Sequence, residues 1–366
     1  MCVAKTRFCL LKTGGMAIVL YGAYGYTGRL IAQEAARSGV ELLLAGRNAE
    51  KLKIIGHALG FPWRACQLDD SAGLRDLLSE AQVVIHAAGP FMFTARPMIE
   101  ACLDTSTHYL DITGEVGVFE LAARFSERAK QVGVMLMPGT GFDVVPTDCL
   151  AVYLKEQLPD ATHLALAFMG LGGVSHGTAT TMVQGLGQGG LVRADGKLKR
   201  VPLGHKTLQV PFRSDRTYLA MSIPWGDVAT AWYSTGIPSI ETYMPVSPIQ
   251  YRYVRLMRWF NWLLRQRWVK RLIQRRIDKK LVGPSEQERA RGRSYVWGQV
   301  RNAWGQTRAA RLETLEGYTL TAISSVLIAQ KVVAGRFKTG FQTPGMAYSA
   351  DLILEIPHTK RTDLPA

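Results

Sequence analysis

Short apolar runs alternate with segments of helical periodicity over the first 148 residues of the chain. The apolar runs have the length of buried strands, and the segments between them place apolar residues three and four positions apart. Strands are expected at 17–21, 41–45, 63–68, 82–88, 108–112 and 134–137, and helices at 29–39, 49–59, 72–79, 97–103 and 118–131. Because strands and helices alternate, the pattern predicts right-handed β-α-β units and a parallel, doubly wound sheet.

The pattern changes after residue 148. Runs rich in Thr, Val, Tyr and Trp predict a largely antiparallel sheet, with strands at 163–169, 207–212, 217–223, 228–233 and 239–245. A closing hairpin is expected from 294–301 and 307–316, then a long helix over 318–334 and a last strand at 352–356. The predicted fold class is therefore α/β, with a second α+β domain inserted before a returning C-terminal segment.

Three glycines stand directly after the first predicted strand. The stretch from Ala17 to Gly28 reads AIVLYGAYGYTG. Gly22 allows a sharp turn, Gly25 leaves room for a pyrophosphate, and Gly28 lets the helix pack closely on the strand. Free N–H groups at the helix start then face the phosphates. In this strand–turn–helix setting we favour cofactor binding over an ordinary turn, and we expect a Rossmann-type fold.

The second predicted strand ends in Gly46, Arg47 and Asn48. Sites that prefer NAD carry an acid roughly 20 residues past the glycines, where it binds the ribose 2′-hydroxyl. This chain has Arg47 instead, and a guanidinium suits a 2′-phosphate because it is fully charged and binds two oxygens. The sequence therefore predicts NADP(H) as the cofactor. The alternative is that Arg47 is a solvated residue after a strand.

Other strand ends complete the predicted cofactor site. Asp69 and Asp70 follow the third strand, where one acid either contacts the adenine edge or is solvated. The fourth strand runs into a small-residue Gly-Pro turn at the carboxyl edge of the sheet, where ligands bind. From the ends of the second, third and fourth strands we predict five further cofactor-binding residues: Asn48, Asp69, Ala88, Gly89 and Pro90.

Composition favours a two-domain α/β enzyme. The chain has 366 residues, 47% hydrophobic content and 36 glycines, which does not fit a disordered protein. The five cysteines form no C-x-x-C pair, so we expect neither a disulfide framework nor a zinc site. The expected compartment is therefore reducing and cytoplasmic. The seven histidines include no H-x-x-x-H pair, so no metal is predicted. No apolar run reaches the length of about 18 residues expected of a transmembrane helix.

Most of the net charge of +15 is concentrated in residues 248–282, which we call the basic segment. It holds eleven Lys or Arg and one acid, Asp278, with Trp259, Trp262 and Trp268 among the arginines. Its apolar residues fall near helical spacing, which suits an interfacial helix lying on an anionic bilayer at the inner membrane. The alternative is one or two ordinary surface helices packed on the second domain. Nucleic acid is not expected, because nothing else indicates a recognition module.

Several motifs, taken in order, resemble those of the saccharopine dehydrogenase-like oxidoreductases, including the bacterial trans-acting enoyl reductases. They are GAYGYTG from Gly22, LAGRNAEKL from Leu44, AAGPF from Ala87, YLDITGE from Tyr109, GTGFDVVPTD from Gly139, HGT from His176, GPSEQER from Gly283 and GFQTPGMAYSADLIL from Gly340. The similarity spans residues 16–356, and the motifs are specific as an ordered set.

The resemblance implies a Rossmann domain that binds NADP(H) and a second α+β domain that closes over it. It places these residues at the cofactor: Gly22, Tyr24, Gly25, Tyr26, Thr27, Gly28, Arg47, Gly89 and Pro90. Relatives often carry a more apolar stretch where this chain has its basic segment. The resemblance does not fix the substrate. Saccharopine reductases reduce a C=N bond formed between two amino acids, whereas the enoyl reductase branch reduces a C=C bond on a polyketide or lipid chain.

The expected domain boundaries follow from these features. Residues 1–15 are expected to be a disordered extension before a natural start at Met16, followed by an NADP-binding domain over 16–148. A substrate and dimerisation domain is expected over 149–317, including the basic segment. Residues 318–357 are expected to pack back as a helix and strand, and 358–366 to form a polar tail.

Hydride transfer requires that the nicotinamide be held against the acceptor carbon. The chain has no Tyr-x-x-x-Lys pair, so the carbonyl chemistry of short-chain dehydrogenases is not indicated. An enoyl acceptor needs its developing enolate stabilised, and then a proton. The polar candidates at strand ends and in the Gly-rich loop are Tyr109, Asp111, Glu115, Asp143, Asp148, His176 and Thr178. We favour Tyr109, Asp111, Asp143 and His176 as catalytic residues; the alternatives are capping for the aspartates and a loop donor for His176.

Three functions stay open on the sequence alone. The favoured one is NADPH-dependent reduction of a C=C bond in an unsaturated acyl or lipid-type substrate, working at a membrane. The second is C=N reduction of amino-acid adducts, and the third is a non-catalytic, membrane-associated NADPH-binding protein. The expected partners are a small-molecule or acyl substrate, an anionic membrane surface and a second copy of the chain in a homodimer.

Overall fold

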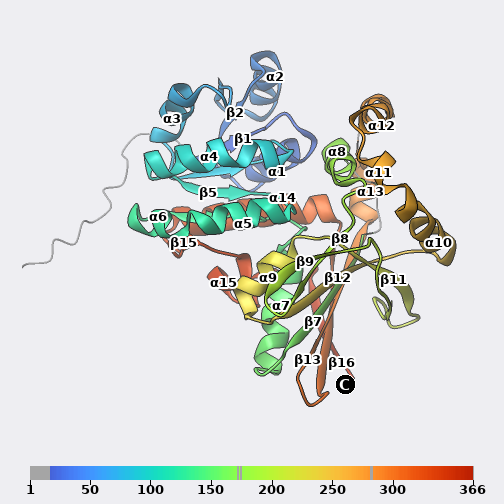
Figure 1. The fold of residues 1–366 in the computed structure, drawn as a ribbon. Helices are drawn as coiled ribbons and strands as arrows, with labels where there is room; N and C mark the ends of the chain where they lie inside the picture. The colour runs from blue at the N-terminus through green and yellow to red at the C-terminus, as the bar shows by residue number, and fades with distance from the viewer. Residues whose placement is uncertain (1–16, 171–172, 174, 281–282, 366) are drawn as a thin grey trace, which may run out of the picture.

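Two sheets, each covered by helices, carry the fold (Figure 1). The computed structural model describes residues 17–365 apart from 171–172, 174 and 281–282. The extension expected at 1–15 and the start expected at Met16 lie outside the described residues.

The first sheet has seven parallel strands in the order β15-β6-β5-β4-β1-β2-β3. The chain enters this sheet at β1, runs outward through β2 and β3, and then returns to β4 on the other side of β1. The direction of winding therefore reverses between β1 and β4, which is where open α/β sheets bind ligands. The strands are β1 (Ile18–Tyr21), β2 (Leu43–Gly46), β3 (Trp63–Ala65), β4 (Val83–His86), β5 (His108–Asp111), β6 (Met135–Met137) and β15 (Gly340–Phe341).

Helices cover both faces of this sheet. Ile18 and Leu20 of β1 point into one core and Val19 and Tyr21 into the other, because successive strand residues face opposite sides. One face carries α1 (Tyr26–Arg37), α2 (Ala49–Leu59) and α14 (Gly317–Val333). The other carries α3 (Ser71–Ser79), α4 (Phe91–Thr105), α5 (Val116–Arg124) and α6 (Ser126–Gln131). Burial on both faces explains why β1 and β4 are continuous apolar runs.

The second sheet has nine strands and is mixed. The main order is β10-β11-β12-β7-β13-β14-β16, and the hairpin of β8 and β9 joins it at β12. Only β7 and β12 pair in parallel among the described strands of this sheet. The strands are β7 (His163–Gly170), β8 (Gly190–Ala194), β9 (Lys197–Val201), β10 (Thr207–Val210), β11 (Tyr218–Ile223), β12 (Ser239–Pro245), β13 (Arg293–Arg301), β14 (Thr307–Leu315) and β16 (Lys360–Leu364).

One helix links the cores of the two sheets. α7 (Val145–Gln157) follows the loop after β6 and packs on β7, β13 and β14. Its buried Leu150 and Leu154 belong to the same apolar cluster as Ile18 of β1 and Val296 of β13. α9 (Asp227–Thr235) packs on α7, and α14 packs on α1. The two domains are therefore joined by a continuous core.

The basic segment is helical and lies at one side of the second domain (Figure 1). It contains α10 (Pro248–Met257), the 3₁₀ turn η1 (Arg258–Phe260), α11 (Asn261–Leu264) and α12 (Arg267–Lys280). α12 packs on α8 (His176–Gly185), and α13 (Glu286–Arg291) follows the segment. The remaining elements are α15 (Pro344–Tyr348) and the 3₁₀ turn η2 (Leu352–Glu355). Within the described ranges, no helix combines the length and the apolar character that crossing a membrane would require.

The strand expected at 228–233 is wrong, because these residues form α9. Val228 to Ala231 are all fully buried, since α9 is packed among α5, α7 and β12. A helix that is buried on several sides shows no amphipathic period, so its Val, Thr and Trp content suggested a strand. Gly236 ends the helix in a left-handed conformation, with φ 69° and ψ 7°.

The strand expected at 352–356 and the polar tail after it are also corrected. Residues 352–355 form the 3₁₀ turn η2, and the strand is β16, which pairs with β14 along the edge of the sheet. An edge strand with one exposed side can be polar, which is why it resembled a tail. The helix expected over 118–131 is divided at Phe125 into α5 and α6.

The hairpin of β8 and β9 was not predicted, although the sequence carries a signal for it. Its turn is Asp195-Gly196, and both residues have positive φ, 53° and 74°. These angles are those of the two-residue turn that Asp-Gly favours between antiparallel strands. The closing hairpin of β13 and β14, the strand at 239–245 and the long helix α14 are confirmed.

Gly298 on β13 gives a test of how tightly α7 joins the sheet. A Cβ at Gly298 would lie 2.7 Å from Leu154 Cδ1 and 3.2 Å from a methyl of Leu150. We expect Gly298→Ala to lower the free energy of unfolding by about 1–3 kcal/mol, because the added methyl overpacks the core. The measurement is the midpoint of urea unfolding.

The matched control is Gly117→Ala in α5, where an added Cβ meets no atom within 4 Å. Its midpoint should be unchanged or higher, because Ala favours a helix over Gly. Equal midpoints for the two variants would contradict the packing described for α7.

Candidate functional site

The glycine turn joins β1 to α1 at the carboxyl edge of the first sheet. Gly22 has φ +87°, and a Cβ there would lie 2.8 Å from the backbone of Ala87 and Ala88. A Cβ on Gly28 would lie only 2.3 Å from the carbonyl oxygen of Gly22. Gly22 thus makes the sharp turn and Gly28 the close helix–strand approach that the spacing predicts.

The N-terminus of α1 is open to an anion. Gly25 is the N-cap residue, no side chain caps this end, and the first turn contains no acid. The N–H groups of the first helical turn have no partner within the helix, and the helix dipole favours negative charge there. This geometry fits the pyrophosphate of a dinucleotide, which the amides of Tyr26, Thr27 and Gly28 would hold.

Tyr24 and Arg47 follow the neighbouring strands β1 and β2. The Tyr24 ring covers Gly46, where a Cβ would come within 2.8 Å of a ring carbon. Arg47 is exposed directly after β2. Burial raises the pKa of Tyr21, and the charges of Arg47 and Asp69 act on the same hydroxyl, so both side chains lie near one end of β1. This is the position that a 2′-phosphate on the adenosine ribose would occupy.

Two neighbouring polar residues are helix caps. Asn48 Oδ1 accepts a hydrogen bond from the Lys51 amide at 2.9 Å and caps α2. Asp70 Oδ1 accepts one from the Gly73 amide at 2.9 Å and caps α3. Because Asp70 caps α3, the exposed Asp69 is the one of these two acids that we assign to the adenine edge. The cofactor contacts of Asn48 and Asp69 stay predictions.

A buried histidine orders the loop after β4, and sequence reasoning missed it. His86 is completely buried, and its Nε2 lies 3.0 Å from Thr94 Oγ1, which itself donates to the Ala88 carbonyl at 2.8 Å. Burial lowers the pKa of His86 to about 3, so the ring is neutral and donates its Nε2–H to Thr94. These two hydrogen bonds fix Ala88 just before the cis Gly89–Pro90 peptide. A lone histidine inside the apolar run QVVIHAA was the available signal.

Glu115 supports the same loop from the next strand end. Its carboxylate accepts hydrogen bonds from the amides of Phe91 at 2.9 Å and Met92 at 2.8 Å, and so satisfies the first turn of α4. Burial raises the pKa of Glu115, while these two hydrogen bonds oppose the shift. Glu115 is therefore a positioning group for the Gly89–Pro90 turn.

Tyr109 and Asp111 lie beneath the site and are both fully buried. The Tyr109 hydroxyl donates to Asp111 Oδ2 at 2.5 Å, and the amides of Thr113 and Gly139 donate to Asp111 Oδ1, each at 2.9 Å. Burial raises the pKa of Asp111 to about 7, although these hydrogen bonds lower it. Asp111 therefore ties the loop after β5 to the loop after β6. A catalytic role for either residue stays a prediction.

Asp143 is the predicted catalytic residue that the structure places in a half-buried position beside aromatic side chains. Its carboxyl lies against Gly114, where a Cβ would come within 2.7 Å of Oδ2. Trp225 Nε1 donates to the Asp143 carbonyl at 3.0 Å. Burial raises the pKa of Asp143 to about 7, and the charge of Glu115 adds to the shift. The carboxyl is therefore protonated in part at neutral pH, which is what a proton donor requires.

Three aromatic rings from both domains lie close to one another near the Asp143 backbone. The ring centroids of Phe168 and Trp225 lie 4.5 Å apart, and those of Phe142 and Phe168 lie 6.0 Å apart. All three side chains are half-buried, so each keeps part of its surface exposed. We call these three residues the aromatic group. Sequence reasoning named none of them, because only the fold brings β7 and the loop before α9 to the loop after β6.

His176 lies on another contact between the domains. It is the first residue of α8. The preceding residue, Ser175, makes the contact, because its amide donates to the Tyr318 hydroxyl at 2.6 Å. The rings of Tyr318 and Tyr26 meet edge to face, with centroids 5.0 Å apart. The Tyr26 hydroxyl in turn donates to the Pro284 carbonyl at 2.5 Å. Tyr26, predicted from the resemblance to contact the cofactor, thus also contacts the second domain.

The remaining acids of this region have structural partners or deep burial. Asp148 accepts hydrogen bonds from Ser234 Oγ at 2.6 Å and from the Gly345 amide at 2.7 Å, and so joins α7 to α9 and α15. Asp227 of α9 is fully buried, and burial raises its pKa well above the usual range. Across the described residues, no three His, Cys, Asp or Glu side chains are grouped so as to hold a metal ion.

Comparison with known proteins bears on this geometry. Residues 18–137 match the family model of the saccharopine dehydrogenase NADP binding domain. The chain is 27% identical over 265 residues to the saccharopine dehydrogenase-like oxidoreductase of Bos taurus, covering 64% of this chain and 62% of that protein. It is 32% identical over 184 residues to a putative trans-acting enoyl reductase of Mycobacterium tuberculosis, covering 46% of this chain and 43% of that protein. The matches thus span about half the length of these relatives.

The fold has a solved counterpart. Apo saccharopine dehydrogenase (L-Glu forming) from Saccharomyces cerevisiae superimposes with a TM-score of 0.68 and 12% sequence identity, covering 96% of this chain and 100% of that one. The predicted fold class and the family resemblance are confirmed. The match of residues 18–137 to an NADP binding domain supports NADP(H), predicted from Arg47, as the cofactor.

Arg47 is expected to decide which nicotinamide cofactor binds. In Arg47→Ala, NADPH affinity should fall by about 10- to 100-fold, because a hydrogen-bonded charge partner of the 2′-phosphate is lost. NADH affinity should change little, since NADH has no phosphate at that position. The measurement is the dissociation constant of each cofactor by calorimetry.

Lys53→Ala is the control, because Lys53 is an exposed residue on α2 outside the predicted site. It should leave both dissociation constants unchanged. Equal losses of NADPH and NADH affinity in Arg47→Ala would overturn the assignment of the 2′-phosphate to Arg47.

Proposed function

We propose that this chain is an NADPH-dependent reductase of the C=C bond in an unsaturated acyl substrate. The observation that carries the proposal is the position of Asp143, whose pKa is raised to about 7, next to Phe142 in the sequence and with its backbone carbonyl bonded to Trp225 of the aromatic group. A carboxyl that holds a proton near neutral pH and rings that offer apolar surface are what an enoyl acceptor needs.

The balance of the reaction assigns a task to each part of the site. NADPH, when bound, supplies a hydride to the β-carbon of the conjugated C=C bond. The α-carbon then takes a proton, so that one C=C bond becomes a single bond and NADPH becomes NADP⁺. The Asp143 carboxyl donates that proton and is afterwards reprotonated from solvent.

Other residues act by holding this arrangement. Asp111 fixes the backbone of Thr113 and Gly139, and so sets the two loops that carry Gly114 and Asp143. Glu115 fixes the Gly89–Pro90 turn, and its charge helps to raise the pKa of Asp143. We assign Asp111 and Glu115 as positioning residues, and Tyr109 as the donor that orients Asp111.

The aromatic group favours an acyl substrate over a pair of amino acids. An amino-acid adduct carries several carboxylates, which proteins bind with arginine side chains. The arginine found near Tyr26, Arg289, donates instead to the Tyr26 hydroxyl at 3.1 Å and to the Pro284 carbonyl at 2.9 Å. The name of the mycobacterial relative, a putative trans-acting enoyl reductase, supports the same choice.

The proposal is tested by NADPH oxidation with a panel of acceptors. We expect turnover with enoyl thioesters, with KM falling as the acyl chain lengthens, because longer chains bury more apolar surface. Mixtures of amino acids with semialdehydes should give no turnover. Turnover with those mixtures alone would establish the C=N alternative, and tight NADPH binding without turnover on either set would establish a non-catalytic protein.

Asp143→Asn should lower kcat by roughly 100-fold or more, because the proton donor is lost. The pH profile checks the role. With Asp143 the rate should be full below its pKa of about 7 and fall as pH rises above it, since only the protonated carboxyl donates. This basic limb should be absent in Asp143→Asn. The control is Asp76→Asn, an exposed ion-pair partner of Arg64, which should keep both rate and profile.

A further inference from the structure

The first helix of the basic segment carries its apolar face on the outside. Ile249, Tyr253, Leu256 and Phe260 follow one another at helical spacing, and their side chains are 64%, 65%, 57% and 43% exposed. No residue of α10, η1 or α11 is buried. A helix on a globular protein normally turns such a stripe toward the core. We call these four residues the outer stripe.

The opposite side of α10 is attached to the protein. The Tyr251 hydroxyl donates to the Gly204 carbonyl at 3.2 Å. Arg258 donates through Nε to the Leu203 carbonyl at 2.9 Å and through a terminal nitrogen to Gly204 at 2.6 Å. A capping box between Ser247 and Gln250 fixes the start of the helix. The outer stripe therefore points outward from a well-anchored helix.

α12 repeats this arrangement. Lys270 donates to the Gln184 carbonyl at 2.6 Å and Gln274 to Thr180 Oγ1 at 2.9 Å, so one side of α12 is held on α8. On the other side Trp268 is 61% exposed and Leu272, one turn later, is 51% exposed. Between the two helices, Trp259 and Trp262 are 82% and 65% exposed. The exposed apolar side chains thus continue from α10 to Leu272 of α12.

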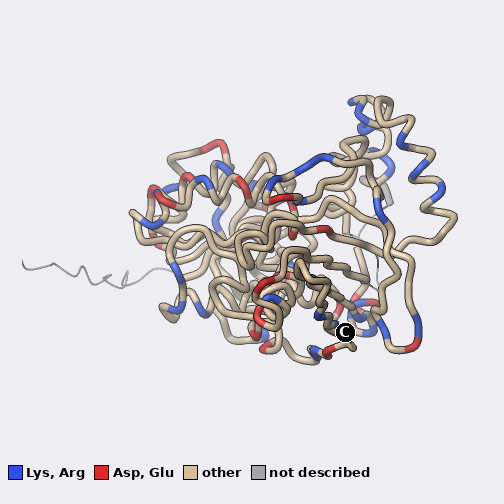
Figure 2. Tube along the Cα trace, turned by 60° about the horizontal axis from the view of Figure 1, so that its bottom comes forward, with Lys and Arg blue, Asp and Glu red and all other residues tan. Residues whose placement is uncertain are grey.

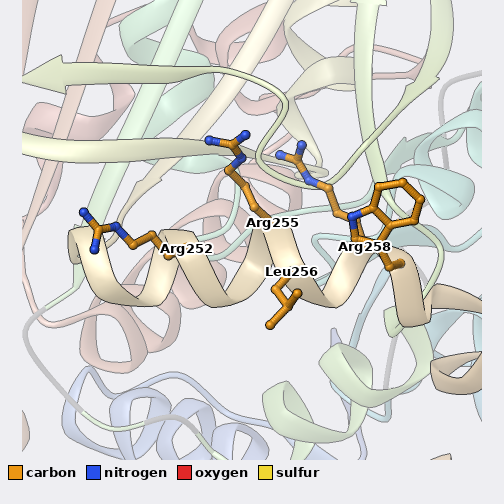
Figure 3. Close-up of a pocket in the computed structure, with 5 residues that line it drawn as sticks. Arg252, Arg255, Leu256 and Arg258 are labelled. Atoms are coloured by element: carbon orange, nitrogen blue, oxygen red, sulfur yellow. The ribbon is translucent and has the colours of Figure 1, made fainter.

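Basic side chains surround these residues. Figure 2 shows Lys and Arg recurring along the helices at this side of the molecule, and the sequence of the basic segment contains eleven of them against one acid. Arg252 and Arg255 of α10 and Arg258 of η1 extend to one side and Leu256 to the other (Figure 3). The three arginines line a hollow of about 620 Å³ together with Leu256 and Trp259.

We propose that the outer stripe and the exposed residues of α12 dock on an anionic lipid bilayer. Aliphatic and tryptophan side chains would enter the headgroup boundary, and the exposed Arg252 and Arg255, which share a hollow with Leu256, would contact lipid phosphates. A second copy of the chain fits less well, because two such faces would bring their positive charges together. A nucleic acid offers phosphates but no apolar phase for Ile249, Leu256 and Leu272.

This inference stands on the surface alone and does not depend on the reaction. Docking has a consequence for the contact between the domains nevertheless, because α8 packs on α12 of the basic segment. α12 packs on α8, which begins at His176 directly after the contact of Ser175 with Tyr318. A bilayer bound at α10–α12 would therefore lie on the same side of the second domain as this contact.

The test is sedimentation of the full chain with vesicles. The probes are vesicles of phosphatidylcholine alone and vesicles in which part of it is replaced by phosphatidylglycerol. We expect binding to the anionic vesicles and little to the neutral ones. The combined variant Ile249→Ser, Tyr253→Ser, Leu256→Ser should lower binding roughly tenfold or more, because apolar insertion is lost while every charge remains.

A second variant removes charge and keeps the apolar side chains. Arg252→Gln with Arg255→Gln should also lower binding roughly tenfold or more, because each basic side chain near an anionic surface strengthens adsorption. The matched controls are Ile54→Ser with Trp304→Ser, which are 69% and 78% exposed elsewhere, and Lys53→Gln with Lys197→Gln. Both controls should bind as the unchanged chain does.

Several results would overturn the proposal. Equal binding to neutral and anionic vesicles would remove the role of the arginines. Unchanged vesicle binding by the serine variant would show that charge alone causes adsorption, as expected of a site for polyanions. A dimer in light scattering that the serine variant dissociates, without vesicle binding, would assign the face to a second copy. Circular dichroism and NADPH affinity of each variant confirm that it is folded.

Discussion

The close approach of α1 to β1 is the constraint on which the site depends. The Gly28 Cα comes so near the Gly22 carbonyl that a methyl group would lie 2.3 Å from it. Only glycine allows this contact, and the contact fixes where α1 begins. The uncapped amides of the first turn are then held at the carboxyl edge of the sheet, between the ends of β1 and β4. Arg47, Glu115 and the Gly89–Pro90 turn are arranged around that point by neighbouring strands.

Much of the first domain could be predicted because its signals are local. The apolar runs, the glycine spacing and Arg47 each act within a few residues of where they stand in the sequence. The second domain was less predictable, since its elements are defined by what packs on them. The sequence of α9 shows no amphipathic period because this helix is buried on several sides, and β16 is a polar edge strand. The Asp195-Gly196 turn was a local signal that went unused.

The site shows the same division. The strand-end positions of Asp111 and Asp143 followed from the sequence, but their environments did not. That Asp111 is fully buried under Tyr109, whereas Asp143 keeps partial exposure beside Trp225, depends on contacts between segments far apart in the chain. His86 and the aromatic group were missed for the same reason. A sequence pattern identifies a polar residue at a strand end, whereas burial and partners decide what that residue can do.

Tyr26 gives the fold a property that neither domain has alone. It stands in the first turn of α1, while its ring meets Tyr318 and its hydroxyl binds the Pro284 carbonyl. Occupancy of the α1 N-terminus and the contact between the domains therefore share one side chain. Thermodynamic linkage requires any such coupling to be reciprocal: a factor by which a bound dinucleotide changed this contact would equal the factor by which the contact changed dinucleotide binding. A dinucleotide held at the α1 N-terminus would thus bind beside a contact that joins the two domains.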